Sequence, residues 1–300
     1  MKDEQIVSQN LRELTGLWSK NRERMLYALS ELSHLVAADI RKGKIALHTP
    51  YDFADGVRHL FSEEPSFPED TYAEYLPFLS AELDHTRFTS IAAFARFLEQ
   101  ETEDVSFEPL TLAQAPAPIR AAYVPSPMAQ TVFEHLSNLL TDPAVLYVGG
   151  ADEACSAVLA SHADIALLPL TGENGERVAA MERLTEKYRM ALVLSVRIYP
   201  EGENETAYGV FAPTPLALTA TDPTETEIRF IAESFPQAAC IASALSLLGF
   251  SVVRQIFSSA EYGGISVRVT LRGKGGLKAL WFFLSLAAAG FEILGRYSSI

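Results

Sequence analysis

Cysteine is scarce in this 300-residue sequence, and the two that are present, Cys155 and Cys240, lie far apart. Neither belongs to a Cys-x-x-Cys pair or to a Cys/His cluster, which argues against a disulfide framework and against a zinc site. The six histidines show neither His-x-His nor His-Glu-x-x-His spacing. We therefore expect no bound metal.

Positive charge is also in short supply, because 24 Lys and Arg stand against 38 Asp and Glu, for a net charge of −14. General nucleic-acid binding needs clustered cations, so we expect no nucleic-acid partner. The longest apolar stretch, Leu277 to Phe291, contains Lys278 and is too short to span a bilayer. The start, Met1 to Gln5, is charged and no apolar core follows it. These features predict a cytoplasmic protein with no membrane segment.

Cofactor and hydrolase motifs are missing as well. The turns at Gly149-Gly150 and Gly172 to Gly175 match neither Gly-x-Gly-x-x-Gly nor the phosphate loop that ends in Gly-Lys-Ser. The sequence has no Gly-x-Ser-x-Gly elbow and no Cys/His pair. We therefore expect no cofactor and no hydrolase nucleophile.

The first 110 residues are predicted to be all-helical. Between Gln5 and Lys42 there is no proline and one glycine, and apolar residues recur at spacings of three, four and seven, which predicts a long amphipathic helix ended by Gly43. Further helices are expected from after Pro50 to about Phe61 and over 81–100. Ala113 to Pro118 then reads as a semi-rigid linker.

Residues 118–222 alternate between short apolar runs rich in β-formers and helical stretches, which is typical of an α/β layer with a mostly parallel sheet. The expected strands are 121–124, 145–148, 165–168, 192–196 and 208–211, and helices are expected over 129–140 and 152–161.

Residues 226–300 have the order βαββαβ, the ferredoxin-like split motif. The expected strands are 228–232, 251–257, 265–271 and 291–297, with helices over 236–248 and 275–289. A sheet with its helices on one face leaves the other face or an edge to be covered, so we expect a homodimer.

The order of the three segments resembles the bifunctional chorismate mutase/prephenate dehydratases. Residues 226–300 look like the amino-acid-binding ACT domain of that family and end in a close version of its last strand, Ile293-Leu294-Gly295-Arg296-Tyr297. Ala163 to Leu170 is similar to the family's ADYGVVPIENS segment, and Asn204 to Phe211 to its Thr-Arg-Phe segment. The resemblance implies a helical domain where the mutase stands, a reduced α/β dehydratase-like lobe and a C-terminal ACT-like domain.

For the dehydratase, the resemblance implies Thr206 as the catalytic residue. Alanine 207 stands where the family has arginine, and Thr171-Gly172-Glu173 replaces Glu-Asn-Ser. Ile119 to Ala220 provides only 102 residues, about one lobe of a two-lobed domain. These changes predict a degraded dehydratase site. The alternative is that Thr206 is an ordinary threonine at the start of a strand.

For the mutase, the resemblance implies Arg12, Arg24 and Lys44 as catalytic residues. Rearrangement of chorismate is unimolecular, so an enzyme needs cations that converge on two carboxylates and an ether oxygen. Alternatively, these are solvated helix charges paired with neighbouring glutamates such as Glu13 and Glu23. If the protein is an enzyme, mutase (isomerase) activity is favoured over dehydratase (lyase) activity.

For the ACT-like domain, the resemblance implies an effector site for an aromatic amino acid. Its residues here are Gln237, Ala238, Ala239, Ser258 and Ser259. A dimer-forming role without a ligand is the alternative. Two functions stay open: an enzyme of phenylalanine biosynthesis acting on chorismate or prephenate, and a non-catalytic amino-acid-sensing homologue.

Overall fold

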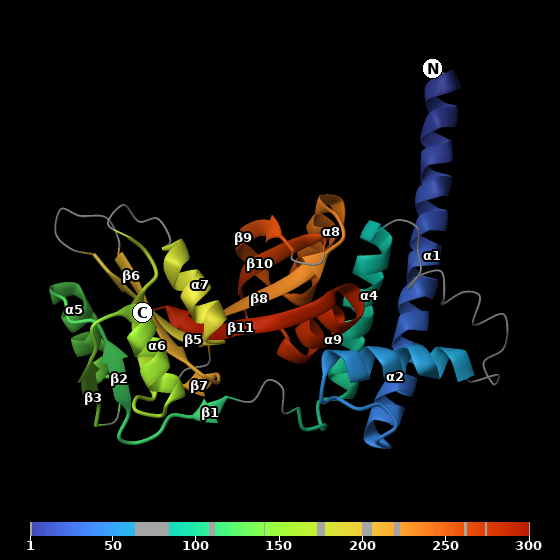
Figure 1. Ribbon diagram of the computed structural model, residues 1–300. Helices are drawn as coiled ribbons and strands as arrows, with labels where there is room; N and C mark the ends of the chain where they lie inside the picture. Colours follow the sequence, from blue (N-terminus) through green and yellow to red (C-terminus); the bar gives the residue numbers. More distant parts are fainter. Residues whose placement is uncertain are drawn as a thin grey trace.

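The structure is a computed structural model, and it describes residues 2–63, 84–107, 112–140, 142–172, 178–199, 206–218, 223–260, 263–273 and 275–299. The side chains of residues 2–19, 61–63, 84–86 and 289 are not among those described. Figure 1 shows the arrangement: helices of the N-terminal segment lie at one end of a long sheet and the middle segment at the other.

The N-terminal segment is helical, as predicted, with α1 (Lys2–Arg41), α2 (Pro50–Glu63) and α4 (Asp84–Glu101). Helix α1 ends where expected, because Gly43 takes the left-handed conformation (φ +70°) that favours glycine. The start of α2 is capped by Thr49, whose Oγ1 accepts from the Asp52 amide at 3.1 Å. The part of the predicted third helix that precedes Asp84 lies outside the described residues.

The middle segment forms one five-stranded part of the sheet, in the order β3-β2-β4-β6-β5. Its sheet is mixed, which corrects the prediction of a mostly parallel one: β6 runs antiparallel to both β4 and β5. The elements are β2 (Arg120–Tyr123), α5 (Pro127–Ser137), β3 (Ala144–Tyr147), α6 (Ala151–Leu159), β4 (Ile165–Pro169), α7 (Ala179–Lys187), β5 (Ala191–Ile198) and β6 (Thr206–Ala212).

The C-terminal segment has the predicted βαββαβ order, and its strands lie in the order β11-β8-β10-β9 with antiparallel neighbours. The elements are β8 (Glu225–Ala232), α8 (Phe235–Leu245), a 3-10 turn η2 (Ser246–Leu248), β9 (Ser251–Ser259), β10 (Ile265–Arg272), α9 (Leu277–Ala287) and β11 (Ala289–Ser299). The apolar faces of α8 and α9 pack on one face of this sheet.

The two sheets are one sheet of nine strands, because β11 pairs in parallel with β5. No pattern in the sequence predicts this junction. It depends on Gly295, where an added Cβ would overlap the carbonyl oxygen of Leu192. The last strand therefore crosses from the C-terminal segment into the middle segment.

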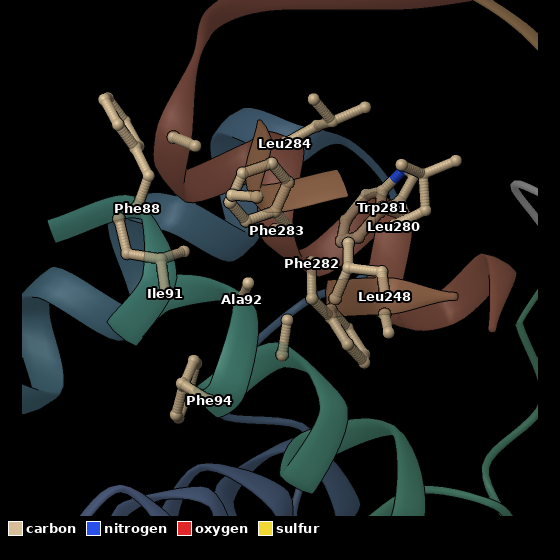
Figure 2. Packing of buried hydrophobic residues seen from close by; sticks show 14 of the residues in the cluster. Phe88, Ile91, Ala92, Phe94, Leu248, Leu280, Trp281, Phe282, Phe283 and Leu284 are labelled. Carbon is tan, nitrogen blue, oxygen red and sulfur yellow. The ribbon is translucent and has the colours of Figure 1, made fainter. Parts of the chain in front are cut away.

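The N-terminal helices and the C-terminal segment share one hydrophobic core. Helix α4 lies against α8 and α9, and Figure 2 shows Ala92 on the side of α4 that is turned toward the aromatic residues of α9, with Phe94 on the other side. Phe53 of α2 contacts Phe282, with ring centroids 4.9 Å apart. The helix layer that would otherwise be exposed is thus covered by the same chain.

Ionised side chains join the same two segments at the helix ends. The Glu99 carboxylate of α4 accepts the Ala279 amide at 3.3 Å, at the start of α9. In return, Nζ of Lys278 donates to the carbonyls of Thr102 (2.7 Å) and Val105 (2.8 Å), just after α4. A carboxylate at a helix N-terminus and a cation at a C-terminus both complement the helix dipole.

The predicted linker is anchored to the body of the protein. Within it, β1 (Ala113–Gln114) pairs in parallel with β7 (Leu216–Ala217). Across the described ranges, no helix combines the length and the apolar character that a membrane crossing requires.

Candidate functional site

The middle segment has an edge at which the carboxyl ends of β2, β3, β4 and β5 and the start of β6 meet. The register places Ile198, the last residue of β5, opposite Thr206, and Pro169 at the end of β4 opposite Tyr208. In open α/β sheets, ligands bind outside the carboxyl ends of the strands. We call this the carboxyl edge; it is the position where this lobe would bind a small molecule.

Thr206, the residue expected to be catalytic, lies at the carboxyl edge and is half-buried. Its neighbour Ala207 is held tightly: the Ala207 amide donates to Oγ1 of Thr171 at 2.7 Å, and its carbonyl accepts the Leu170 amide at 2.7 Å. Thr171 is the first of the three residues, Thr171-Gly172-Glu173, that stand where the resembling family has Glu-Asn-Ser. The chain thus places two threonines next to each other at this edge.

Two helices begin at the carboxyl edge, but their N-termini differ in charge. Helix α5 is capped by Ser126, whose Oγ accepts the Ala129 amide at 3.1 Å, and its first turn has no acidic residue. Helix α6 has Asp152 and Glu153 in its first turn, and Glu153 accepts the Gly149 amide at 2.7 Å. An anionic ligand would therefore be repelled at α6 and accepted more readily at α5.

A cation that sequence reasoning missed lies at this edge. Arg197 of β5 is directly opposite Ala207 in the antiparallel pair, so both side chains project from the same face. Arg197 is exposed, and Ala207 is the position where the resembling family has arginine. Arg197 could have been found only from the register of β5 against β6, and no pattern within a single strand gives that register.

Exposed tyrosine side chains also lie at the carboxyl edge. Tyr147 at the end of β3 and Tyr199 after β5 are 59% and 70% exposed. Tyr123 is buried beneath Tyr147, with ring centroids 5.5 Å apart, and its hydroxyl donates to Oε1 of Gln130 at 2.8 Å. Burial first, and then the hydrogen bond with Tyr147, raise the pKa of Tyr123 to about 12, so it stays neutral.

Two of the residues implied for a mutase, Arg24 and Lys44, lie far apart in this chain. Arg24 is exposed on α1, and at a rise of ~1.5 Å per residue it lies about 25 Å from the end of that helix. Lys44 is exposed just beyond the helix end, with its Nζ 3.7 Å from Oδ1 of Asp39. The backbone of Arg12 lies on α1, and its side chain is outside the described set.

The residues implied for an effector site lie at one end of the C-terminal sheet. An aromatic contact between Phe235 and Phe257, with centroids 5.4 Å apart, joins the start of α8 to the end of β9, next to Ser258 and Ser259. Both serines are exposed. We call this region, made of Phe235, Phe257, Ser258 and Ser259, the α8/β9 end.

The three helical residues of that set have different surroundings. The Gln237 side chain accepts the Glu233 backbone amide at 2.6 Å, and the backbone amide of Gln237 donates to Oγ of Ser234 at 3.3 Å, so Gln237 completes the cap of α8. Ala238 is buried in the core, and Ala239 is exposed. Of the three, Ala239 alone has an exposed side chain with no such structural role.

Among the described residues, no three His, Cys, Asp or Glu side chains are grouped so that they could hold a metal ion. Cys155 is buried on α6, and burial raises the pKa of its thiol to about 11. A thiol in this state is a poor nucleophile at neutral pH.

Neither a family model nor a curated protein matches the sequence. Solved structures do match. Prephenate dehydratase from Streptococcus mutans aligns with a TM-score of 0.50 and 13% identity, over 60% of this chain and 98% of that one. The quorum-quenching acylase GqqA aligns at 0.48 and 18%, over 60% and 95% of the two chains. Prephenate dehydratase from Arthrobacter aurescens, solved in complex with L-Phe, aligns at 0.48 and 10%, over 60% and 90%. Over 60% of its length, this chain therefore has a fold like that of prephenate dehydratase.

Proposed function

We propose that this protein is a non-catalytic amino-acid-binding homologue of the chorismate mutase/prephenate dehydratases. In this proposal its segments are a helical domain (1–110), a reduced dehydratase-like lobe (118–222) and an ACT-like regulatory domain (226–300). The fold-level similarity to prephenate dehydratase supports the relationship. The function is argued from the site.

The observation that carries the proposal is the short connection between β5 and β6. Strand β5 ends at Ile198 and β6 begins at Thr206, so seven residues join them, and β4 is separated from α7 by nine. Neither connection is long enough to form a second lobe over the carboxyl edge. Dehydration of prephenate needs donors and cations around a dianion in a site that excludes water. A single open lobe lacks that enclosure.

The α8/β9 end offers what an aromatic amino acid would need. Phe235 and Phe257 are 61% and 43% exposed, which is unusual for phenylalanine and leaves ring faces available for an aromatic side chain. The hydroxyls of Ser258 and Ser259 and the unpaired backbone of an edge strand provide hydrogen-bonding groups next to the rings. We propose L-phenylalanine or a close analogue as the ligand.

We further propose that a second copy pairs with the β9 edge. Strand β9 is the last strand of the sheet, and Val253 and Phe257 are exposed on it. In an antiparallel pair of two β9 strands centred on Gln255, Val253 of each copy would lie opposite Phe257 of the other. No two residues of like charge would lie opposite each other. The ligand region would then lie at the interface of two copies.

The amino-acid proposal is tested by calorimetric titration of the full chain with L-phenylalanine, L-tyrosine and L-tryptophan. We expect saturable binding of at least one, a rise in melting temperature by mass action, and loss of both effects in Phe257→Ala. Leu247→Ala is the matched control, because Leu247 is equally exposed at 44% but lies in the 3-10 turn. Equal binding by Phe257→Ala, or no binding by any of the three, would reject the site.

A second candidate is residual dehydratase activity, which is favoured by the positions of Thr206, Thr171 and Arg197 at the carboxyl edge, with Thr206 and Arg197 on opposite faces of the sheet. It predicts that prephenate is converted to phenylpyruvate and that Thr206→Val and Arg197→Gln each lower kcat/KM by at least about tenfold. Arg183→Gln, on the neighbouring helix α7, is the control. Formation of phenylpyruvate at the rate of the uncatalysed reaction would eliminate this candidate.

A mutase site would need cations from a second copy, because Arg24 lies about 25 Å from the end of α1 and Lys44 lies just beyond that end. Incubation with chorismate tests it directly. Prephenate formation that disappears in Arg12→Ala, with the helical circular-dichroism signal unchanged, would assign mutase activity to the N-terminal segment. Our proposal expects no prephenate.

A further inference from the structure

The buried side chains are divided among the cores in a way that does not follow the order of the chain. One core contains residues of the N-terminal helices, such as Leu32 and Phe94, together with residues of the C-terminal segment, such as Phe230 and Leu284. No described residue of the middle segment belongs to it. The middle segment has two cores of its own, to which the rest of the described chain contributes Tyr297. Packing therefore joins the two ends of the chain and sets the middle apart.

Helix α9 shows why the C-terminal segment needs the N-terminal helices. Eight of its eleven residues are buried, and Ala279 to Ser285 are buried without a gap. Seven consecutive residues cover about two turns of a helix, so every side of α9 is enclosed. The C-terminal sheet covers one side, and α2 and α4 lie against the helix as well. Helix α9 is thus the middle layer of three, and the outer layer comes from the N-terminal segment.

Two phenylalanines of the N-terminal segment cover α9 directly. Phe53 of α2 and Phe107, which follows α4, each contact both aromatic rings of Trp281 and Phe282. The ring centroids are between 4.9 and 5.8 Å apart. An enclosed aromatic side chain buries roughly 150–250 Å², so separation of the two segments would return on the order of several hundred Å² of apolar surface to water.

The start of α9 is shaped to receive a side chain of the N-terminal segment. The Glu99 carboxylate of α4 accepts the Ala279 amide, and it lies against Gly276, the residue before the helix. An added Cβ at Gly276 would overlap that carboxylate. Lys278 bonds in return to the carbonyls that follow α4. The two helices therefore cap each other, which fixes how the segments fit together.

The chain enters and leaves the middle lobe at one place. Strand β1 precedes the lobe and β7 follows its last long strand, and the two pair in parallel, with Ala113 opposite Leu216 and Gln114 opposite Ala217. The Ala113 amide also donates to the carbonyl of Pro215 at 3.0 Å. A segment whose two ends lie side by side can be inserted into another unit without separating the parts of that unit.

We propose that the N-terminal helices and the C-terminal segment form one folding unit of three layers, and that the middle lobe is an insertion in this unit. The function of the N-terminal helices is then to complete the C-terminal domain by covering α9. Packing alone accounts for their presence, with no separate activity. The inference goes beyond the proposed function, because it makes the helical segment a part of the C-terminal domain, and it holds whether or not an amino acid binds.

Hydrogen exchange of the full chain, measured at amides that exchange through unfolding, tests the proposal. The reporters are buried residues in three places, Ala37 of α1, Val269 of β10 and Val210 of β6. Ile91 of α4 is 1% exposed, so Ile91→Val removes one buried methyl group. We expect exchange to become about two- to twelvefold faster by the same factor at Ala37 and at Val269. Exchange at Val210, in the lobe, should stay unchanged.

Ile165→Val is the matched control, because Ile165 is fully buried on β4 of the middle lobe. Here the increase should appear at Val210 and be absent at Ala37 and Val269. An increase in Ile91→Val that reaches Ala37 but not Val269 would show that the helices form a separate domain and overturn the proposal. Equal increases at all three amides would show that the lobe is not an insertion and overturn it as well.

Cleavage of the folded chain gives a second measurement. A protease site is placed between Phe107 and Leu112 and cut in the full-length protein. We expect the two fragments to elute together in size-exclusion chromatography at micromolar concentration, and Phe53→Ala to weaken their association by at least about a hundredfold. Tyr51→Ala is the control, because Tyr51 is exposed on the same helix. Separation of the wild-type fragments in native buffer, or equal association in the two variants, would overturn the proposal.

Discussion

The middle lobe and the C-terminal segment are both sheets with helices packed on them, but they expose different surfaces. The C-terminal sheet is covered by its own chain: α8 and α9 lie under α4, and its β11 edge is joined to β5. Its β9 edge and the α8/β9 end stay accessible. At the carboxyl edge of the middle lobe the connections are short, with seven residues between β5 and β6 and nine between β4 and α7. The difference supports our proposal that a ligand binds at the accessible C-terminal end rather than at the open lobe.

The largest expected effect comes from breaking the core that the N-terminal and C-terminal segments share. Phe53 has no exposed surface and contacts Trp281 and Phe282. Phe53→Ala should therefore lower the free energy of unfolding by about 3–5 kcal/mol. Urea denaturation followed by tryptophan fluorescence measures it.

Tyr51→Ala on the same helix is the control, because Tyr51 is 73% exposed and its loss should cost less than about 1 kcal/mol. A loss below about 1 kcal/mol in Phe53→Ala would show that the two segments do not share a core.

The junction between the compared sheets depends on Gly295. In Gly295→Ala the added Cβ overlaps the Leu192 carbonyl, so β11 must move away from β5. We expect a loss of about 2–3 kcal/mol in unfolding free energy, measured by thermal denaturation. Gly150→Ala, which meets no atom within 4 Å, should cost about 1 kcal/mol or less. Equal costs for the two substitutions would mean that β5 and β11 are not closely paired.

The accessible β9 edge is expected to hold a second copy. Val253→Lys places a cation on this edge and should convert a dimer into a monomer, since lysine on an edge strand opposes pairing. Sedimentation velocity measures the change. Leu159→Lys, at an equally exposed position (52%) on α6, should leave the dimer intact. A dimer that persists in Val253→Lys would move the interface elsewhere.

The smallest effect concerns thiol reactivity in the middle lobe. Because burial raises the pKa of Cys155 to about 11, less than about 1% of this thiol is ionised at pH 8. Iodoacetamide at pH 8 should modify half-buried Cys240 well before Cys155, as followed by mass spectrometry of peptides. The rate at Cys155 should rise with pH up to about 11. Equal rates at pH 8 would show that α6 does not bury its cysteine as described.

Local patterns in the sequence were enough to predict the helices and strands, but they did not predict which of them pack or pair with each other. Helix lengths follow from apolar spacing and from Gly43, and each strand of the C-terminal segment includes the range predicted for it. The β5–β11 junction joins residues about 100 positions apart in the sequence, and it requires a glycine at position 295. No periodicity reveals such a contact.

Helix α4 carried a signal that could have been used. Its apolar residues lie on more than one face, since Phe88, Ile91 and Leu98 are buried on one side and Ala93 and Phe97 pack half-buried on the other. A helix that is apolar around most of its circumference is expected to pack on two sides. Here α1 lies on one side and α8 with α9 on the other. The pattern indicates two partners without identifying them.

The candidate site was predicted in part. Thr171 follows the end of β4 and lies at the carboxyl edge, where the alternation of strands and helices predicted that the ends of parallel strands would meet. Thr206, at the start of β6, lies at the same edge because β6 runs antiparallel to β4 and β5, which the sequence did not predict. Arg197 was missed, because its position opposite Ala207 depends on the register of two antiparallel strands. The roles of all these residues remain predictions.

The central claim is that the chain binds an aromatic amino acid at the α8/β9 end and does not dehydrate prephenate. The most direct test is calorimetric titration of one preparation with L-phenylalanine, with prephenate turnover assayed in the same sample. The account predicts saturable binding that Phe257→Ala abolishes, and phenylpyruvate formation no faster than without protein. Rapid phenylpyruvate formation together with no amino-acid binding would contradict it.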